Sequence, residues 1–89
     1  MEKTIKWSAP FTRAYEQRIA HHEPLKTAFF ASLEVFQAEP ELVSAHPLAD
    51  KMVGRGSFWI NNTHRVIYRE TATTFLLLDV GTHEQVYER

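Results

Sequence analysis

Two stretches in the first half of the chain carry hydrophobic residues at the spacing of amphipathic helices. The first covers residues 10–22, where Ser8 is placed to cap the helix and Pro10 suits its first turn. The second covers residues 24–38 and stops at Pro40. The apolar stripes are Phe11, Tyr15 and Ile19 in the first helix, and Leu25, Phe29, Leu33 and Phe36 in the second. The short link between the helices predicts an antiparallel helical hairpin.

Short alternating segments on either side of this hairpin predict strands. Residues 4–7 form the first, and residues 57–61 and 65–70 form two more, joined by a turn at 61–63. Residues 74–80 are almost continuously apolar, which is typical of a central strand buried on both faces. We expect residues 40–56 to form a loop with a short helical turn near 41–44, and residues 83–87 to form a terminal strand or turn.

These elements predict an α+β domain. The N-terminal strand and the helical hairpin are expected to pack on one face of a small, mostly antiparallel four-stranded sheet. The 89 residues, 1–89, make a single domain with a small core. No apolar run approaches the roughly 18–20 residues of a membrane span or the apolar stretch of a signal peptide. The chain has no cysteine, which excludes disulfides and thiolate metal sites. We therefore expect a cytoplasmic protein.

The net charge of −1 argues against an extended nucleic-acid-binding surface, because proteins that have such a surface are usually basic. The charge is unevenly distributed, however. Residues 46–70 hold four basic side chains, Lys51, Arg55, Arg65 and Arg69, against two acidic ones. A local basic site of this size can hold a single phosphate.

Histidine, arginine and tyrosine side chains recur at the ends of the predicted strands, where a rigid sheet could direct them toward one phosphate. The segments are His46-Pro-Leu, Gly54, Ser57-Phe-Trp-Ile-Asn, His64-Arg-Val-Ile-Tyr-Arg69, and Leu76-Leu-Leu-Asp-Val-Gly-Thr-His83-Glu-Gln-Val-Tyr87. Their order and spacing resemble the RelE/ParE superfamily of bacterial toxins. Within it, the chain is most similar to the branch of small endonucleases that cleave mRNA on the ribosome.

The resemblance implies a RelE-like fold and a metal-independent endoribonuclease that acts on mRNA in the translating ribosome. It also implies a cognate antitoxin that holds the toxin inactive in a hetero-oligomer. No cofactor, metal or membrane is implied. RNA cleavage by its own 2'-hydroxyl needs a base, a cation for the phosphorane and an acid for the leaving oxygen, and histidine and arginine suit these roles.

The resemblance assigns a role to each candidate residue. Arg65 contacts the scissile phosphate, His83 is the acid, and His46 or Lys51 is the base. Tyr87 stacks on a base or orients the substrate, although it could equally be a core aromatic. Two further arginines are candidates for substrate contacts, Arg55 in the loop and Arg69 on the strand of Arg65; a salt bridge is the stronger expectation for Arg69.

Two other functions fit the same fold. A ParE-like toxin would inhibit DNA gyrase without enzymatic activity, but its chain usually ends in a basic stretch, which differs from the segment 81–87 here. A catalytically inactive module would only bind an antitoxin or another protein. Phe29 and Phe30 are adjacent, so only one of them can belong to the core stripe. The other is a candidate for a surface patch that binds a partner protein.

Overall fold

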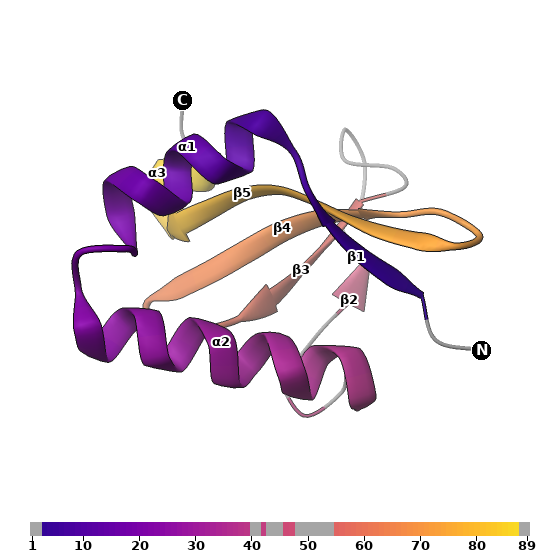
Figure 1. Ribbon diagram of the computed structural model, residues 1–89, viewed down its shortest axis with the longest axis horizontal. Coiled ribbons are helices and arrows are strands. Elements are labelled where there is room, and N and C mark those ends of the chain that lie inside the picture. Colours follow the sequence, from indigo (N-terminus) through magenta and orange to yellow (C-terminus); the bar gives the residue numbers. More distant parts are fainter. Residues whose placement is uncertain (1–2, 40–41, 43–45, 48–54, 88–89) are drawn as a thin grey trace.

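The computed structural model describes residues 3–39, 42, 46–47 and 55–87 (Figure 1). The elements in chain order are β1 (Thr4–Trp7), α1 (Ala9–Arg18), α2 (Glu23–Ala38), β2 (His46–Pro47), β3 (Arg55–Trp59), β4 (His64–Glu70), β5 (Thr74–Thr82) and α3 (His83–Tyr87). No helix formed by these residues is long and apolar enough to cross a membrane.

The strands of the described residues form one sheet in the order β1-β5-β4-β3-β2. β1 runs parallel to β5, and the other neighbours are antiparallel. This confirms the predicted α+β class and its mostly antiparallel sheet. The sheet has one strand more than expected, because the backbone of His46 and Pro47, predicted in a loop, pairs with Ser57 and Gly56 of β3.

The two helices form the predicted hairpin (Figure 1). The hydroxyl of Ser8 accepts a hydrogen bond from the Phe11 amide at 3.1 Å, so the predicted N-cap is confirmed. α1 ends at Arg18, a few residues before the predicted end. The chain must reverse between the helices, and His22, at the N-cap of α2, is extended. Residues 19–22 therefore form the link instead of a last helical turn.

The apolar stripes of both helices pack on the same face of the sheet. Phe36 of α2 stacks on Phe58 of β3 with ring centroids 4.3 Å apart, and Phe29 and Tyr15 join the two helices at 5.5 Å. Leu77 of β5 is fully buried in this core, and Leu33 packs against it. The packing of both helices on one sheet face is therefore confirmed.

The strand residues that alternate with this core define the other face of the sheet, which includes Ser57 and Trp59 of β3 and Arg65, Ile67 and Arg69 of β4. α3 follows directly from β5, and it replaces the terminal strand or turn predicted for these residues. Its start is a capping box: the Thr82 amide donates to Gln85 Oε1 at 2.8 Å, and the Gln85 amide donates to Thr82 Oγ1 at 3.3 Å.

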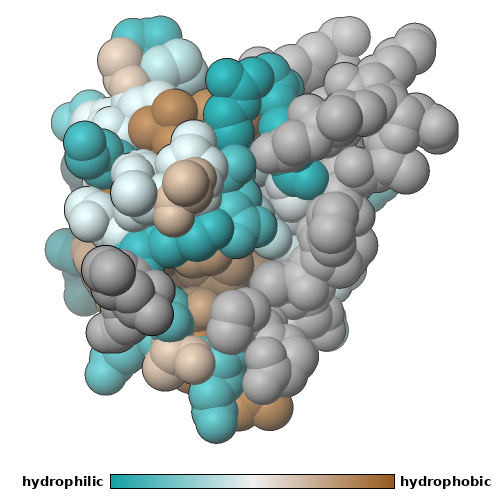
Figure 2. Space-filling view, turned by 90° about the vertical axis from the view of Figure 1, so that its right-hand side faces the viewer, coloured by the Kyte–Doolittle hydropathy of each residue, from teal (hydrophilic) through white to brown (hydrophobic). Residues whose placement is uncertain are grey.

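The end of the molecule that carries the β4–β5 turn has a mostly hydrophilic described surface, with hydrophobic residues only in small separate areas (Figure 2). α3 lies toward the opposite end of the sheet (Figure 1). Polar and aromatic side chains gather around α3, and they form the candidate site.

Candidate functional site

Trp59 and Arg65 face each other across β3 and β4, immediately on either side of the hairpin turn. The turn is closed by the Ile60 amide, which donates to the His64 carbonyl at 2.9 Å. Asn61 fixes the turn further, because its Oδ1 accepts from the amides of Thr63 and His64. The register brings the Arg65 guanidinium carbon to 3.7 Å from the centre of the Trp59 ring system, a close cation–π contact.

Tyr87 of α3 holds the same guanidinium from another direction. Arg65 Nη1 donates to the Tyr87 hydroxyl at 3.2 Å, and the guanidinium carbon lies 5.3 Å from the phenol ring centre. The ion pairs of the described residues do not include Arg65, and its buried Nε has no hydrogen-bond partner among them. Aromatic rings, rather than a carboxylate, therefore position this arginine, and in the described part of the chain its positive charge is not neutralised.

His83 is the first residue of α3, and its side chain is exposed. Its ring lies 4.7 Å from the ring of Tyr87, centre to centre. Arg65, Tyr87 and His83 thus form a continuous row. The structure brings together three residues that the sequence singled out, although they come from β4 and from a helix that the sequence did not predict.

The side chains of Gln85 and Arg18 closely approach the backbone of Gly81, where the chain turns from β5 into α3. A Cβ atom on Gly81 would lie 2.5 Å from Gln85 Oε1, the atom that caps α3, and 3.1 Å from Arg18 Nη1. A larger residue there would have to displace one of these side chains. Gly81 therefore lets the capping contact form directly beside His83.

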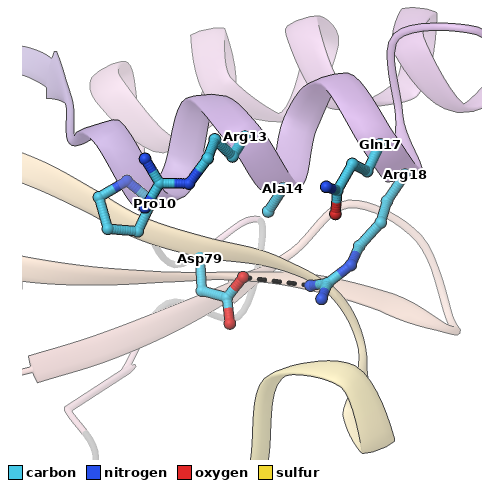
Figure 3. Close-up of a pocket in the computed structure, with 6 residues that line it drawn as sticks. All are labelled: Pro10, Arg13, Ala14, Gln17, Arg18 and Asp79. Atoms are coloured by element: carbon cyan, nitrogen blue, oxygen red, sulfur yellow. Dashed lines mark hydrogen bonds and ion pairs between the residues drawn. The ribbon is translucent and has the colours of Figure 1, made fainter.

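Arg18 ties α1 to the same part of β5 (Figure 3). Its Nη1 donates to Asp79 Oδ1 at 3.2 Å and to the Val80 carbonyl at 2.9 Å. β1 pairs with β5 only as far as Leu77, so Arg18 bonds to the edge of β5 beyond the last residue of that pairing. These contacts lie at a polar pocket of about 200 Å³, which is also lined by Pro10, Arg13, Ala14 and Gln17.

The other predicted site residues differ in how closely they approach this row. Arg55 and Arg69 are register partners across β3 and β4. They lie on the face of Arg65 but four residues along the strand, roughly 13 Å away. The salt bridge expected for Arg69 is absent from the ion pairs of the described residues. The backbone of His46 pairs with Ser57 in β2, and Lys51 lies outside the described residues.

An open pocket of about 500 Å³ adjoins the row, between the β3–β4 turn and the start of α3. Its lining consists of Trp59, Asn62, Thr63, Thr82, His83 and Glu84. Of these residues, His83 belongs to the row and Trp59 contacts it, and we call Arg65, Trp59, Tyr87 and His83 together the Arg65 cluster. The pocket and the cluster are therefore parts of one surface.

Two titratable groups near the hairpin have shifted pKa values. Burial lowers the pKa of His64, and the nearby His22 lowers it further. Burial also raises the pKa of Tyr68, with a smaller contribution from the charge of Glu70. Tyr68 lies in the core beneath the helices, on the opposite side of the sheet from Arg65, so its titration does not bear on the candidate site.

Solved structures of bacterial toxins share this arrangement of strands and helices. A chain of the E. coli DinJ-YafQ toxin-antitoxin complex matches with a TM-score of 0.77 over 98% of this chain and 99% of its own length, at 15% identity. A chain of the RelBE2 toxin-antitoxin complex from Mycobacterium tuberculosis matches with a TM-score of 0.73 over 93% and 100%, at 21% identity. The YoeB/ParE toxin from Agrobacterium tumefaciens matches with a TM-score of 0.74 over 90% and 98%, at 19% identity.

The chain has the fold of the RelE/ParE toxins. No protein-family model matches the sequence, and neither does any curated protein. The likeness is thus one of fold across the whole chain, and it agrees with the resemblance found in the sequence motifs.

On this RelE/ParE fold, the most informative residue without a role in the sequence analysis is Trp59. The signal was present, because Trp59 and Arg65 lie at equal distances from the centre of the predicted turn at 61–63 and must therefore be cross-strand neighbours. Asn62, Thr63 and Glu84 gave no comparable signal, since polar residues in turns and at helix ends are common.

Proposed function

We propose that this chain is the toxin of a toxin–antitoxin pair and that it cleaves mRNA on the translating ribosome. One observation carries the proposal. The Arg65 guanidinium is held between aromatic groups, is not paired with a carboxylate of the described residues, and is linked through Tyr87 to the exposed imidazole of His83. A fixed cation beside a proton-transfer group supplies two of the three groups needed to cleave a phosphodiester by its neighbouring 2'-hydroxyl.

In this mechanism the 2'-oxygen attacks the adjacent phosphorus while its proton passes to a base, for which His46 and Lys51 are the candidates. Arg65 contacts two non-bridging oxygens and stabilises the negative charge of the phosphorane. His83, in its protonated form, donates a proton to the 5'-oxygen as the bond to phosphorus breaks. Tyr87 keeps the guanidinium in place through its hydroxyl. No metal ion or other cofactor takes part in the proposal.

The low net charge of the chain is consistent with a toxin that meets its mRNA on the ribosome. With a net charge of −1, and with Arg55, Arg65 and Arg69 on one face of the sheet, the protein is proposed to have little electrostatic affinity for long free RNA. A ribosome that holds the mRNA strand in place would supply that affinity, and the toxin would then need only to engage a few nucleotides.

The antitoxin is proposed to cover exposed aromatic surface on the helical side of the molecule. Phe29 is fully buried, whereas Phe30 is 45% exposed and Trp7 is 36% exposed. The rings of Phe30 and Trp7 stack with centroids 6.5 Å apart, so they form one apolar patch. A hydrophobic segment of an antitoxin would remove this patch from water in a toxin–antitoxin hetero-oligomer.

Expression with and without the neighbouring reading frame tests the proposal, together with a map of RNA ends on translating ribosomes. We expect growth arrest by the chain alone, rescue by the partner, and new mRNA ends inside ribosome-protected regions. Growth arrest with intact mRNA and inhibited DNA gyrase would establish the ParE-like function instead. Unimpeded growth at verified expression of folded protein would favour the inactive binding module.

A further inference from the structure

We propose that the pocket between the β3–β4 turn and α3 binds a guanine base of the RNA, and that the Glu84 carboxylate recognises its Watson–Crick edge. This inference rests on the proposed function, because it takes RNA as the ligand of the neighbouring Arg65 cluster. It adds a base preference at a defined position of the substrate.

The pocket has the size and the lining of a nucleobase site. Its volume of about 500 Å³ lies within the range of small-molecule sites. Its lining includes the half-buried Trp59, which offers an aromatic side chain, and Asn62, Thr63 and Glu84, which offer polar groups. A flat ligand with an apolar face and a polar edge suits such a lining, and bases of single-stranded RNA commonly contact aromatic side chains in this way.

The position of the pocket connects the base to the reacting phosphate. Trp59 lines the pocket and also contacts the Arg65 guanidinium at 3.7 Å. His83 lines the pocket as well, and its ring contacts that of Tyr87. A nucleotide whose phosphate contacts Arg65 would therefore have this pocket within reach of its base.

The chemistry of Glu84 selects among the four bases. An ionised carboxylate has two acceptor oxygens and no donor. Guanine presents two adjacent donors, N1–H and the N2 amino group, on its Watson–Crick edge. In adenine, cytosine and uracil, every donor on that edge has an acceptor beside it, which would face a carboxylate oxygen. A carboxylate near a phosphate site also repels RNA, and only guanine would offset that repulsion with two hydrogen bonds.

Binding of four trinucleotides tests this assignment. They are UNU sequences with 2'-O-methyl sugars, which lack the attacking hydroxyl and cannot be cleaved, and they differ only in the central base. The full chain carries Trp7→Phe, so that Trp59 is the single remaining tryptophan and its fluorescence reports on the pocket. We expect the guanine trinucleotide to bind about fivefold or more tightly than the other three, as one bidentate base contact provides.

Glu84→Gln should remove this preference, because an amide offers one acceptor and one donor in place of two acceptors. Glu34→Gln is the matched control. It makes the same change of charge on an exposed position of α2, the helix that packs on the other face of the sheet, and it should leave the ranking of the bases unchanged. Both variants are compared by thermal melting, which should not change at these exposed sites.

Equal binding of the four trinucleotides by the wild-type pocket would overturn the inference. A guanine preference that survives Glu84→Gln would overturn it too, since the carboxylate would not be the group that recognises the base. The measurement does not depend on cleavage. A chain that prefers guanine through Glu84 but cuts no RNA would therefore contradict the nuclease proposal while leaving the base site in place.

Discussion

At the scale of single residues, Arg65 is defined by the groups that hold it. An arginine on an exposed strand commonly pairs with a carboxylate, which would neutralise the charge that a phosphate requires. Here Trp59 and Tyr87 position the guanidinium, and the ion pairs of the described residues do not include it. Rings can orient a planar cation without neutralising it, which suits the role proposed for Arg65 at a dianionic transition state.

Arg65→Lys separates charge from geometry. Lysine keeps the positive charge and most of the apolar stem, but it lacks the planar fork that stacks on Trp59 and contacts two phosphate oxygens. We expect cleavage of ribosome-bound mRNA in single-turnover assays to fall on the order of 10²-fold or more. Arg65→Ala is less informative, because it also removes the packing around the buried Nε. Cleavage by the lysine variant at the wild-type rate would show that charge alone suffices.

His83→Ala tests the proton donor. His83 is exposed, so its removal should leave the melting temperature close to that of the wild type. The cleavage rate should fall on the order of 10²–10⁴-fold, the usual cost of losing a positioned acid. His21→Ala, an exposed histidine in the link between the helices, is the control and should cleave normally. An unaffected His83→Ala variant would exclude this imidazole as the acid.

Tyr87→Phe isolates the hydroxyl that accepts a hydrogen bond from Arg65 at 3.2 Å. The aromatic ring, with its contacts to His83 and the guanidinium, is retained in this variant. A hydrogen bond to a charged group contributes about 1.5–3 kcal/mol, and the lower end of that range corresponds to the loss of cleavage we expect, on the order of tenfold. That loss should be smaller than the one caused by Arg65→Lys. A larger loss would assign Tyr87 a direct part in the reaction.

At the scale of elements, helical and strand periodicity predicted the parts that bury apolar side chains. The stripes at Phe11 and Tyr15 and at Phe29 and Phe36 meet the sheet as expected, because an apolar stripe on a helix has to be covered. The alternation along residues 57–61 and 65–70 is likewise kept in β3 and β4, where Phe58 and Arg65 lie on opposite faces of the sheet. Periodicity therefore gave the layers of the fold before any contact was known.

Elements too short to repeat a pattern were not predicted. β2 has only two residues and exists through its pairing with β3, which leaves no trace in its own sequence. α3 has five residues, too few for a stripe, and Val86 and Tyr87 read equally well as strand. A local signal for α3 was nevertheless available, because Thr82 and Gln85 have the spacing of a capping box.

The sequence also predicted only part of the candidate site. The residue types and their order indicated Arg65, His83 and Tyr87, and these three do come together in the structure. Their roles stay predictions. The contribution of Trp59 depends on strand register, and that of Glu84 depends on α3, so both required the three-dimensional arrangement.

The contact between Arg18 and β5 makes a prediction about the support of the site. Arg18→Met keeps the apolar stem but removes the donor to Asp79 and to the Val80 carbonyl. The two groups are largely buried, so we expect a loss of about 1–2 kcal/mol, which lowers the melting temperature of a domain this size by several degrees. Arg13→Met, at an exposed position that lines the same pocket, is the matched control and should melt like the wild type.

Arg18→Met should also slow cleavage more than its loss of stability explains, because Val80 lies just before the turn into α3. Single-turnover rates measured well below the melting temperature separate the two effects. If the rate is unchanged while the melting temperature falls, Arg18 stabilises the fold without positioning His83.

At the scale of the whole molecule, the two faces of the sheet differ in what they carry. One face is buried under α1 and α2 and holds the hydrophobic core, while the other carries the Arg65 cluster and the pocket proposed to bind a base. The link between the helices approaches the β3–β4 turn, where His22 acts on His64. Protonation of His64 is therefore expected to change the stability of the whole fold, although His64 directly precedes Arg65 in the chain.

Because burial and His22 lower the pKa of His64 in the folded chain, the unfolded chain binds a proton at a higher pH than the folded one does. Unfolding is then favoured by protons as the pH falls below about 6.5, the ordinary pKa of histidine. The stabilising effect of the neutral ring is fully present above that pH, and it is lost as the pH falls through the lower, folded-state pKa.

His64→Gln should therefore reduce the loss of melting temperature between pH 8 and pH 5.5. His22→Gln should produce a smaller change in the same direction, since it removes only the second cause of the shift. The comparison carries its own control at pH 8, where His64 is neutral in both states and its titration contributes nothing. An identical pH dependence in wild type and His64→Gln would show that the proton on His64 is not coupled to folding.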